Sequence, residues 1–326
     1  MKLTRSVRHN IIANFTGNVW RGIFNLAFIP VYIKLMGVEV YGLLGVFMSL
    51  SALFILLDMG LSTTLSRELS RLSVIENSEQ ESRNLVRTFE VVYWLIGIVI
   101  GASVIILAPL IAKYWINSAN ISTEIIEQTL LIMGMLLAFQ WPRAIYIGGL
   151  EGLQRQVLYN VIKTLSMLAR HIGAVLILTF ISPSILYFFY WQSVVALITT
   201  IVLAVYLWRS LPKSNGRSKF DKNLFIKNWK FVSGVMGISL GTVLLTQIDK
   251  VILSKMLTLE VFSYYMLATT VATVIMSLVS PIHTALFPRL SQLVVKKDEA
   301  GISDLYHRGC QLASIIILPI SITMIF

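Results

Sequence analysis

Eight stretches of this chain are apolar over about 20 residues or more, the length that a helix needs to cross a hydrocarbon core of about 30 Å. They cover 11–33, 41–63, 91–112, 125–149, 158–181, 184–208, 230–252 and 262–284, and a ninth begins near 309. Lipid offers the backbone no hydrogen bonds, so each stretch must satisfy its own peptide groups. The sequence therefore predicts an all-α fold, a polytopic membrane helix bundle.

The basic residues between these stretches fall on alternate sides of the membrane. Of the 27 lysines and arginines, four lie in segments on the far side: Lys34, Lys113, Lys250 and Lys255. Three arginines lie deeper within spans, and the other 20 basic residues lie on the side of the amino terminus, between spans or near span ends, in 2–8, 67–87, 155–163, 209–230 and 289–308. Positively charged loops stay in the cytoplasm. We predict a multi-pass membrane protein with its amino terminus in the cytoplasm.

Composition narrows the chemistry further. The net charge of +11 sits in short loops beside spans, where anionic membrane lipids are the expected partners and nucleic acid is not. A single cysteine, Cys310, excludes an internal disulfide, and the four histidines lack the spacing of a zinc site. No phosphate-binding loop or paired carboxylates occur. We therefore expect no metal, no cofactor and no enzymatic activity.

A weak internal repeat suggests two lobes. Residues 34–72 overlay 255–293 without a gap, and the overlay matches Lys34 with Lys255 and Glu39 with Glu260. Parallel repeats of this kind are a known transporter plan, with the site between the lobes near the midplane. The expected organisation is a six-helix lobe over 1–208, a basic cytoplasmic linker over 209–229 and the start of a second lobe over 230–326. The chain stops within an apolar run, so the second lobe is expected to be truncated; a ninth helix that just reaches the far side is the alternative.

Three arginines lie inside the predicted spans, namely Arg21, Arg143 and Arg170. Each costs about 2.5–3.5 kcal/mol at mid-membrane unless it meets water, an acid or an anionic ligand. Arg143 follows Pro142, which disrupts the helix and could hold the guanidinium in a cavity; the alternative is that Arg143 snorkels to the surface. Acids are too few to pair all three arginines. The surplus positive charge favours an anionic substrate, phosphate or pyrophosphate.

Other polar residues share these helices. One stripe with Arg21 is formed by residues at helical spacing: Asn14, Asn18 and Asn25. These amides are candidates for hydrogen bonds to sugar hydroxyls. No ATP-binding motif is present, so an ion or proton gradient is the expected driving force. The titratable candidates for that coupling are Asp58, Asp249 and His283.

Four segments resemble the signature segments of the polysaccharide-biosynthesis flippases, the O-antigen (Wzx-type) branch of the MATE-like superfamily. They are LLDMGLSTTLSREL at 56–69, IGGLEGLQR at 147–155, QIDKVILSKML at 247–257 and FPRLSQL at 287–293. The resemblance implies a two-lobe transporter that moves an undecaprenyl-pyrophosphate-linked oligosaccharide across the inner membrane by alternating access. It also implies polysaccharide polymerase or other assembly proteins as partners. The alternatives are another MATE-like exporter, for drugs or other cations, and a membrane enzyme or a scaffold of polysaccharide assembly.

Overall fold

The computed structural model describes residues 24, 26–55, 58, 60–73, 75–214, 216–273 and 298–323, without the side chains of 227–240 and a few others. It divides into two compact units. The larger unit is Pro30–Tyr264, and the smaller combines Met1–Ile29 with Tyr265–Phe326. The larger unit contains α9 together with most helices of the predicted first lobe. The lobe boundary at 209–229 stays a prediction.

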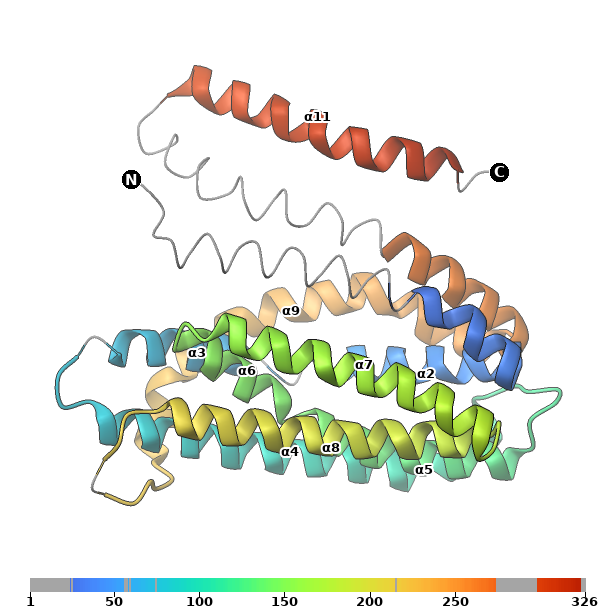
Figure 1. Cartoon of the computed structure of the whole chain (residues 1–326), viewed down its shortest axis with the longest axis horizontal. Helices are drawn as coiled ribbons and strands as arrows, with labels where there is room; N and C mark the ends of the chain where they lie inside the picture. Colours follow the sequence, from blue (N-terminus) through green and yellow to red (C-terminus); the bar gives the residue numbers. More distant parts are fainter. Residues whose placement is uncertain are drawn as a thin grey trace. The chain divides into compact units, whose positions relative to one another are not determined.

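The described chain is helical (Figure 1). After a first helix over Leu26–Met36, the helices are α2 (Val38–Ile55), α3 (Leu61–Leu72), α4 (Glu79–Tyr114), α5 (Thr123–Gln140), α6 (Arg143–Gly152), α7 (Gln156–Phe180), α8 (Ile185–Ser210), α9 (Lys222–Met256) and α11 (Glu299–Thr323). Residues 259–273 are helical as well. Four helical stretches are long and apolar enough to cross a membrane: Glu79–Tyr114, Thr123–Gly152, Gln156–Phe180 and Ile185–Ser210. They confirm the predicted spans at 91–112, 125–149, 158–181 and 184–208.

Two predicted spans are interrupted. The break after Gln140 confirms the effect expected of Pro142, since a new helix begins at Arg143. The break in the span at 41–63 was not predicted: α2 ends at Ile55, and α3 begins after Gly60, which has a φ of 74°. Only glycine adopts this left-handed conformation cheaply. The connection between the predicted spans at 41–63 and 91–112 is itself largely helical, because α3 continues to Leu72 and α4 begins at Glu79.

Helices α3 and α6 pack with their backbones almost in contact. A Cβ atom at Gly148 would lie 2.5 Å from the carbonyl oxygen of Ser62, and one at Gly152 would lie 2.5 Å from that of Ser66. One turn further, the Ser70 hydroxyl donates to the carbonyl of Gly152 at 2.9 Å. In lipid, close approach of this kind replaces the hydrophobic effect as the force that joins helices. This close contact gives the segments at 56–69 and 147–155 a shared structural role, because together they hold α3 against α6.

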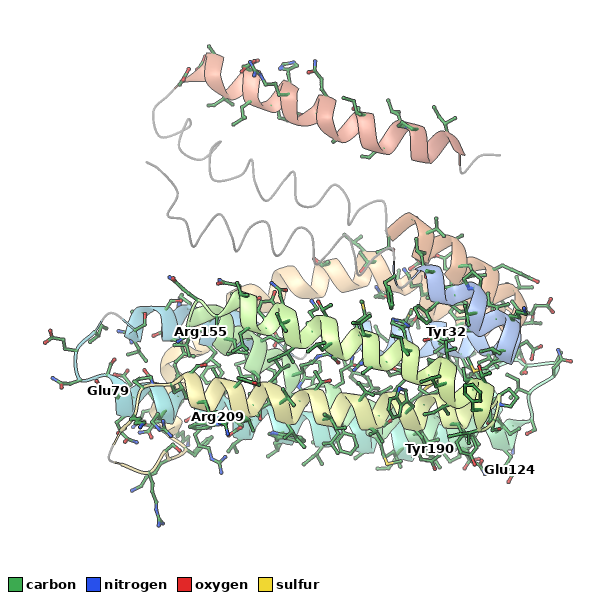
Figure 2. The ribbon with its side chains drawn as sticks, viewed as in Figure 1. Tyr32, Glu79, Glu124, Arg155, Tyr190 and Arg209 are labelled. Atoms are coloured by element: carbon green, nitrogen blue, oxygen red, sulfur yellow. The ribbon has the colours of Figure 1, made fainter. Side chains whose placement is uncertain are left out.

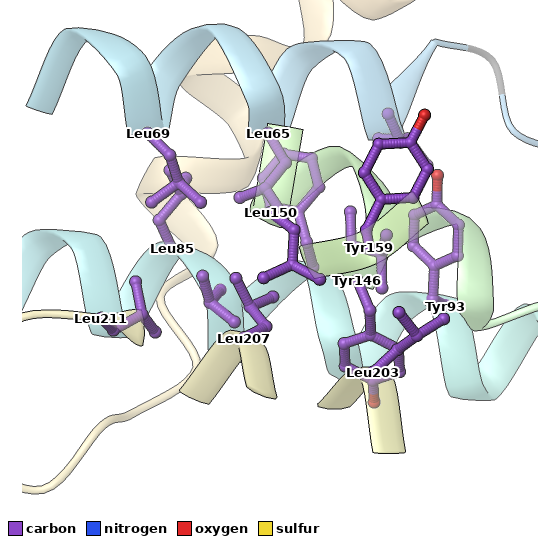
Figure 3. Close-up of a cluster of buried hydrophobic side chains, with 14 of the residues drawn as sticks. Leu65, Leu69, Leu85, Tyr93, Tyr146, Leu150, Tyr159, Leu203, Leu207 and Leu211 are labelled. Atoms are coloured by element: carbon purple, nitrogen blue, oxygen red, sulfur yellow. The ribbon is translucent and has the colours of Figure 1, made fainter. Parts of the chain in front are cut away.

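A buried cluster joins α3, α4, α6, α7 and α8 near this contact (Figure 3). It contains the fully buried leucines Leu65 and Leu150, with Tyr93 and Tyr146 beside them. Next to the cluster lies a buried carboxylate, Glu90. It accepts hydrogen bonds from Tyr146 at 2.8 Å, from the indole of Trp208 at 3.2 Å and from Arg87 at 2.9 Å. Glu90 thus ties three helices together through a fully satisfied polar network.

The segments that the charge pattern assigns to one side also lie together. In the larger unit, Glu79, Arg155 and Arg209 lie at one end of the bundle, and Tyr32, Tyr190 and Glu124 lie at the other (Figure 2). At the first end the connection after α8 hydrogen-bonds to the start of α4, through Gln80 with the carbonyl of Arg217 and the amide of Lys219 with Asn84. We call the first end the basic end and the second the opposite end. The contacts agree with the alternating assignment of the loops.

Thiol labelling would test the orientation. Ser78 is buried, but Glu76, Ala119 and Lys213 are exposed. In a Cys310→Ser background, we expect an impermeant maleimide added to intact cells to label Ala119→Cys and to spare Glu76→Cys and Lys213→Cys. Permeabilised cells serve as the control and should show labelling at all three positions. The reverse pattern in intact cells would show that the basic end faces outward, against the charge rule.

Candidate functional site

The depth of Arg143 and Arg170 in the bundle follows from two hydrogen bonds that α8 makes close to them in the sequence. Thr200 donates to the carbonyl of Phe139 at 2.8 Å, and Thr199 lies 2.6 Å from the hydroxyl of Ser166. Phe139 on α5 and Ser166 on α7 therefore lie at the same level of the bundle. Arg143 is four residues from Phe139 toward the basic end. Arg170 is four residues from Ser166 toward the opposite end, about 6 Å along the helix.

Arg143 and Arg170 thus lie on opposite sides of this level, and their long side chains can reach toward each other across it. The positive charges of the two guanidinium groups repel each other. Both arginines are half-buried. The Nε and Nη2 atoms of Arg170 are fully buried and have no hydrogen-bond partner among the described residues. None of the ion pairs found in the described part of the chain includes Arg143 or Arg170. Two cations at mid-depth that lack an acidic partner among these residues can bind an anion.

Two further polar groups lie at the break between α5 and α6. The Oε1 of Gln140 and the Nε1 of Trp141 are buried, and neither has a hydrogen-bond partner in the described part of the chain. The Trp141 ring stacks on Tyr93 with centroids 6.2 Å apart. Gly97 gives the break room, because a Cβ there would lie 3.1 Å from the carbonyl oxygen of Ala138, which is tighter than an ordinary contact. Irregular backbone at membrane depth is typical of substrate and ion sites. Sequence reasoning missed both residues; the signal was a glutamine beside a proline within an apolar run.

Beyond Arg170, the site ends in aromatic residues. The Tyr32 hydroxyl lies 2.8 Å from the Nδ1 of His171, and the two rings are stacked. Phe188 of α8 meets Tyr32 edge-on, with centroids 5.1 Å apart. Rings of this kind provide flat apolar surface beside polar groups. The region from Arg143 to Tyr32 thus combines cations, an amide and aromatic faces.

The coupling candidates have different surroundings. Asp58 lies in the break before α3, where it accepts hydrogen bonds from Ser62 at 2.9 Å and from Tyr93. Tyr93 thereby links Asp58 to the second break through Trp141. Asp249 on α9 is partly exposed and lies 3.3 Å from the ammonium group of Lys250. Of the predicted site residues, the structure brings together Arg143 and Arg170. The others, Arg21, Asn14, Asn18, Asn25 and His283, lie outside the described residues.

A bundle of membrane-length helices with arginines at mid-depth is typical of multi-pass membrane transporters. The chain belongs to the polysaccharide biosynthesis protein family, whose sequence profile matches residues 7–294. Its structure is similar to that of the MATE multidrug transporter DinF-BH, solved in complex with rhodamine 6G, with a TM-score of 0.64 over 98% of this chain and 72% of that one. The two sequences are 14% identical, so the similarity concerns the fold alone. No curated protein matches the chain.

These comparisons confirm the predicted family and the MATE-like, all-helical fold. The family description implies a glycan-related substrate, and the fold is that of a MATE transporter. The particular substrate is not given by either comparison.

Proposed function

We propose that this protein is a flippase that moves an undecaprenyl-diphosphate-linked oligosaccharide, such as an O-antigen repeat unit, across the inner membrane. The observation that carries the proposal is the pair of arginines at mid-depth. Arg143 and Arg170 repel each other and have no acidic partner in the described part of the chain. A diphosphate supplies the missing negative charge, and guanidinium groups bind phosphate oxygens in bidentate fashion.

The rest of the site fits a glycan next to that anchor. The Trp141 indole can donate to a sugar oxygen, and the Gln140 carbonyl can accept from a hydroxyl. Arg21 and the amides of Asn14, Asn18 and Asn25, which lie outside the described residues, are proposed as further ligands of the substrate. The polyprenyl tail is apolar, so it remains in the bilayer while the headgroup crosses. Polysaccharide polymerase and other assembly proteins are the partners expected downstream.

Transport is proposed to proceed by alternating access, with the two lobes opening in turn to either side of the membrane. Asp58 is the coupling candidate best placed for this role, since Tyr93 connects its carboxylate to the break that holds Trp141 and Arg143. Asp249 and His283 are the other candidates. Protonation of Asp58 would remove the negative charge that the Tyr93 hydroxyl group satisfies, and so change the contact between the two breaks.

A multidrug exporter is the second candidate, because the fold is shared with DinF-BH. A cationic drug would have to approach two guanidinium groups that lack an acidic partner among the described residues, and the repulsion opposes its binding. The charge of the site therefore favours an anionic substrate over a cationic one. A membrane enzyme is less favoured still, since the described site contains no nucleophile–base pair.

Binding measurements decide between the two transporters. Purified protein in nanodiscs would be titrated with undecaprenyl diphosphate, undecaprenyl monophosphate and rhodamine 6G. We expect the diphosphate to bind at least about tenfold more tightly than the monophosphate, a difference of about 1.4 kcal/mol. Rhodamine 6G should bind weakly. Tight rhodamine binding together with weak diphosphate binding would favour the drug exporter. In producing cells, deletion of the gene should remove surface polysaccharide.

A further inference from the structure

Three segments that are distant in sequence meet at the opposite end of the larger unit. They are residues 38–42 at the start of α2, residues 115–120 after α4, and residues 254–263 at the end of α9 and just beyond it. The central contact is a piece of parallel strand pairing between Asn117 and Thr258, in which the amide of Leu259 donates to the carbonyl of Asn117 at 2.7 Å. Backbone pairing between separate helical hairpins fixes their positions closely.

Side chains reinforce this contact on either side. The indole of Trp115 donates to the hydroxyl of Ser254 at 3.0 Å. The ammonium group of Lys255 lies 5.1 Å from the centroid of the same Trp115 ring, within the range of a cation–π interaction. One tryptophan residue therefore holds the end of α9, through its indole N–H and through the face of its ring.

The start of α2 closes the contact from a second direction. Ser263 donates to the carbonyl of Val38 at 2.7 Å. At Gly42, a Cβ atom would lie 2.5 Å from the carbonyl oxygen of Leu259. Glycine at this position is thus required for the close approach of α2 to the segment after α9.

A buried carboxylate holds the loop that presents Asn117. Glu39 accepts hydrogen bonds from the Ser118 hydroxyl at 2.8 Å, from the Asn120 amide at 3.1 Å and from the Asn120 side chain at 2.9 Å. Glu39 is 6% exposed. These hydrogen bonds hold Glu39 and the loop together as one surface, and Ser254 to Ser263 form the surface that faces them.

The other end of α9 is attached differently. There the chain itself connects α8 to α9, and the amide of Asp221 donates to Thr88 of α4 at 2.9 Å. Phe225 packs against Phe89 with centroids 6.2 Å apart. At this end α9 is joined covalently to α8, so a movement of α9 against α8 is limited here and can be larger at the opposite end.

We propose that the contact of 38–42 and 115–120 with 254–263 is the outer gate of the transporter, closed in this structure, and that it must separate for the glycan to leave. The inference rests on the proposed function, and it assigns the gate to particular residues. Pairing of two short backbone segments and single side-chain hydrogen bonds can break and re-form without unfolding any helix. The Glu39 anchor keeps the loop in shape while the gate is open.

A cysteine pair tests the gate. Paired strands lie about 4.8 Å apart, within the Cα separations of about 4.4–6.8 Å that a disulfide spans. Asn117→Cys with Thr258→Cys, in a Cys310→Ser background of the complete gene product, should therefore cross-link on mild oxidation. We expect the cross-linked protein to lose export of surface polysaccharide and to regain it on reduction. Each single cysteine variant should export normally under oxidation.

A wedge variant supplies a second, independent test. Gly42→Leu places bulk against Leu259 and should sharply reduce cross-linking of the 117–258 pair. Gly241→Leu is the matched control, because a Cβ at Gly241 meets no atom of the described residues within 4 Å, and it should leave the cross-linking yield unchanged. Equal yields in the two variants would overturn the close contact on which the gate is built.

Two results would overturn the proposal itself. Quantitative cross-linking with undiminished export would show that the contact is a permanent tie, and failure to cross-link would show that the closed contact is not formed. Spin labels on the same two cysteines in nanodiscs test opening without reference to substrate: a gate gives a short and a long distance, whereas a permanent tie gives one distance. If undecaprenyl diphosphate does not bind but two distances are present, the proposed substrate fails and the gate stands.

Discussion

Arg170→Ala is expected to abolish export of surface polysaccharide while the protein remains in the membrane at its normal level. The Nε and Nη2 atoms of Arg170 have no hydrogen-bond partner among the described residues, so their loss removes no hydrogen bond within that part of the chain. What is lost is a planar donor for the diphosphate. Two hydrogen bonds to a charged group contribute about 1.5–3 kcal/mol each, so binding of undecaprenyl diphosphate should weaken at least about 100-fold.

The conservative replacement separates charge from geometry. Arg170→Lys keeps the positive charge but loses the bidentate fork, and we expect partial export. Arg143→Ala should weaken binding as well, though less if its side chain reaches the surface. Arg155→Ala is the matched control, since Arg155 precedes the same helix but is exposed at the basic end. Unchanged export and unchanged diphosphate binding in Arg170→Ala would leave Arg170 as a contact between helices and remove the basis of the proposed function.

Much of the fold could be predicted because a membrane imposes simple rules. Span length and the alternation of basic loops predicted the four membrane-length helices, and the missing N–H of Pro142 predicted the break before Arg143. The break near Asp58 was missed, since it depends on the φ of Gly60, which an uninterrupted apolar run does not reveal. A hydropathy pattern measures length and says little about local backbone conformation.

The buried carboxylates were missed for another reason. Glu90 lies just outside a predicted span, and Glu39 was noted only as part of a repeat. Each accepts hydrogen bonds from residues about 50 to 120 positions away in the chain, as in the pairs of Glu90 with Tyr146 and Trp208 and of Glu39 with Ser118. Partners at such separations become visible only when helices pack. For the same reason the sequence indicated Arg143 and Arg170 separately, and the structure was needed to show that their charges interact.

The roles of Asn14, Asn18, Arg21, Asn25 and His283 stay predictions, since these residues lie outside the described part of the chain. Their test is the same as for Arg170. If Arg21 shares the site, Arg21→Ala should weaken diphosphate binding to a similar degree. The double variant Arg21→Ala/Arg170→Ala should then fall short of the sum of the single effects, because two ligands of one anion are not independent.

Gly148→Ala is expected to destabilise the protein strongly, although it adds a single methyl group. That methyl carbon would lie 2.5 Å from the carbonyl oxygen of Ser62, so α3 and α6 must move apart. Overpacking of this kind costs about 1–3 kcal/mol, and separation also lengthens the Ser70–Gly152 hydrogen bond. For a domain of about 150–250 residues, each kcal/mol lowers the melting temperature by about 2–4 °C.

The measurement is thermal unfolding of purified protein in detergent, with the amount of protein in the membrane as a second readout. Gly241→Ala is the matched control, because among the residues that the structure describes its Cβ meets no atom within 4 Å, and alanine favours the helix. Its melting temperature should not fall. Gly148→Leu should reduce the amount of folded protein further than Gly148→Ala. A melting temperature of Gly148→Ala equal to that of the wild type would mean that α3 and α6 are not in close contact. The close approach at Ser62 and Ser66 and the hydrogen bond from Ser70 to Gly152 would then not be formed.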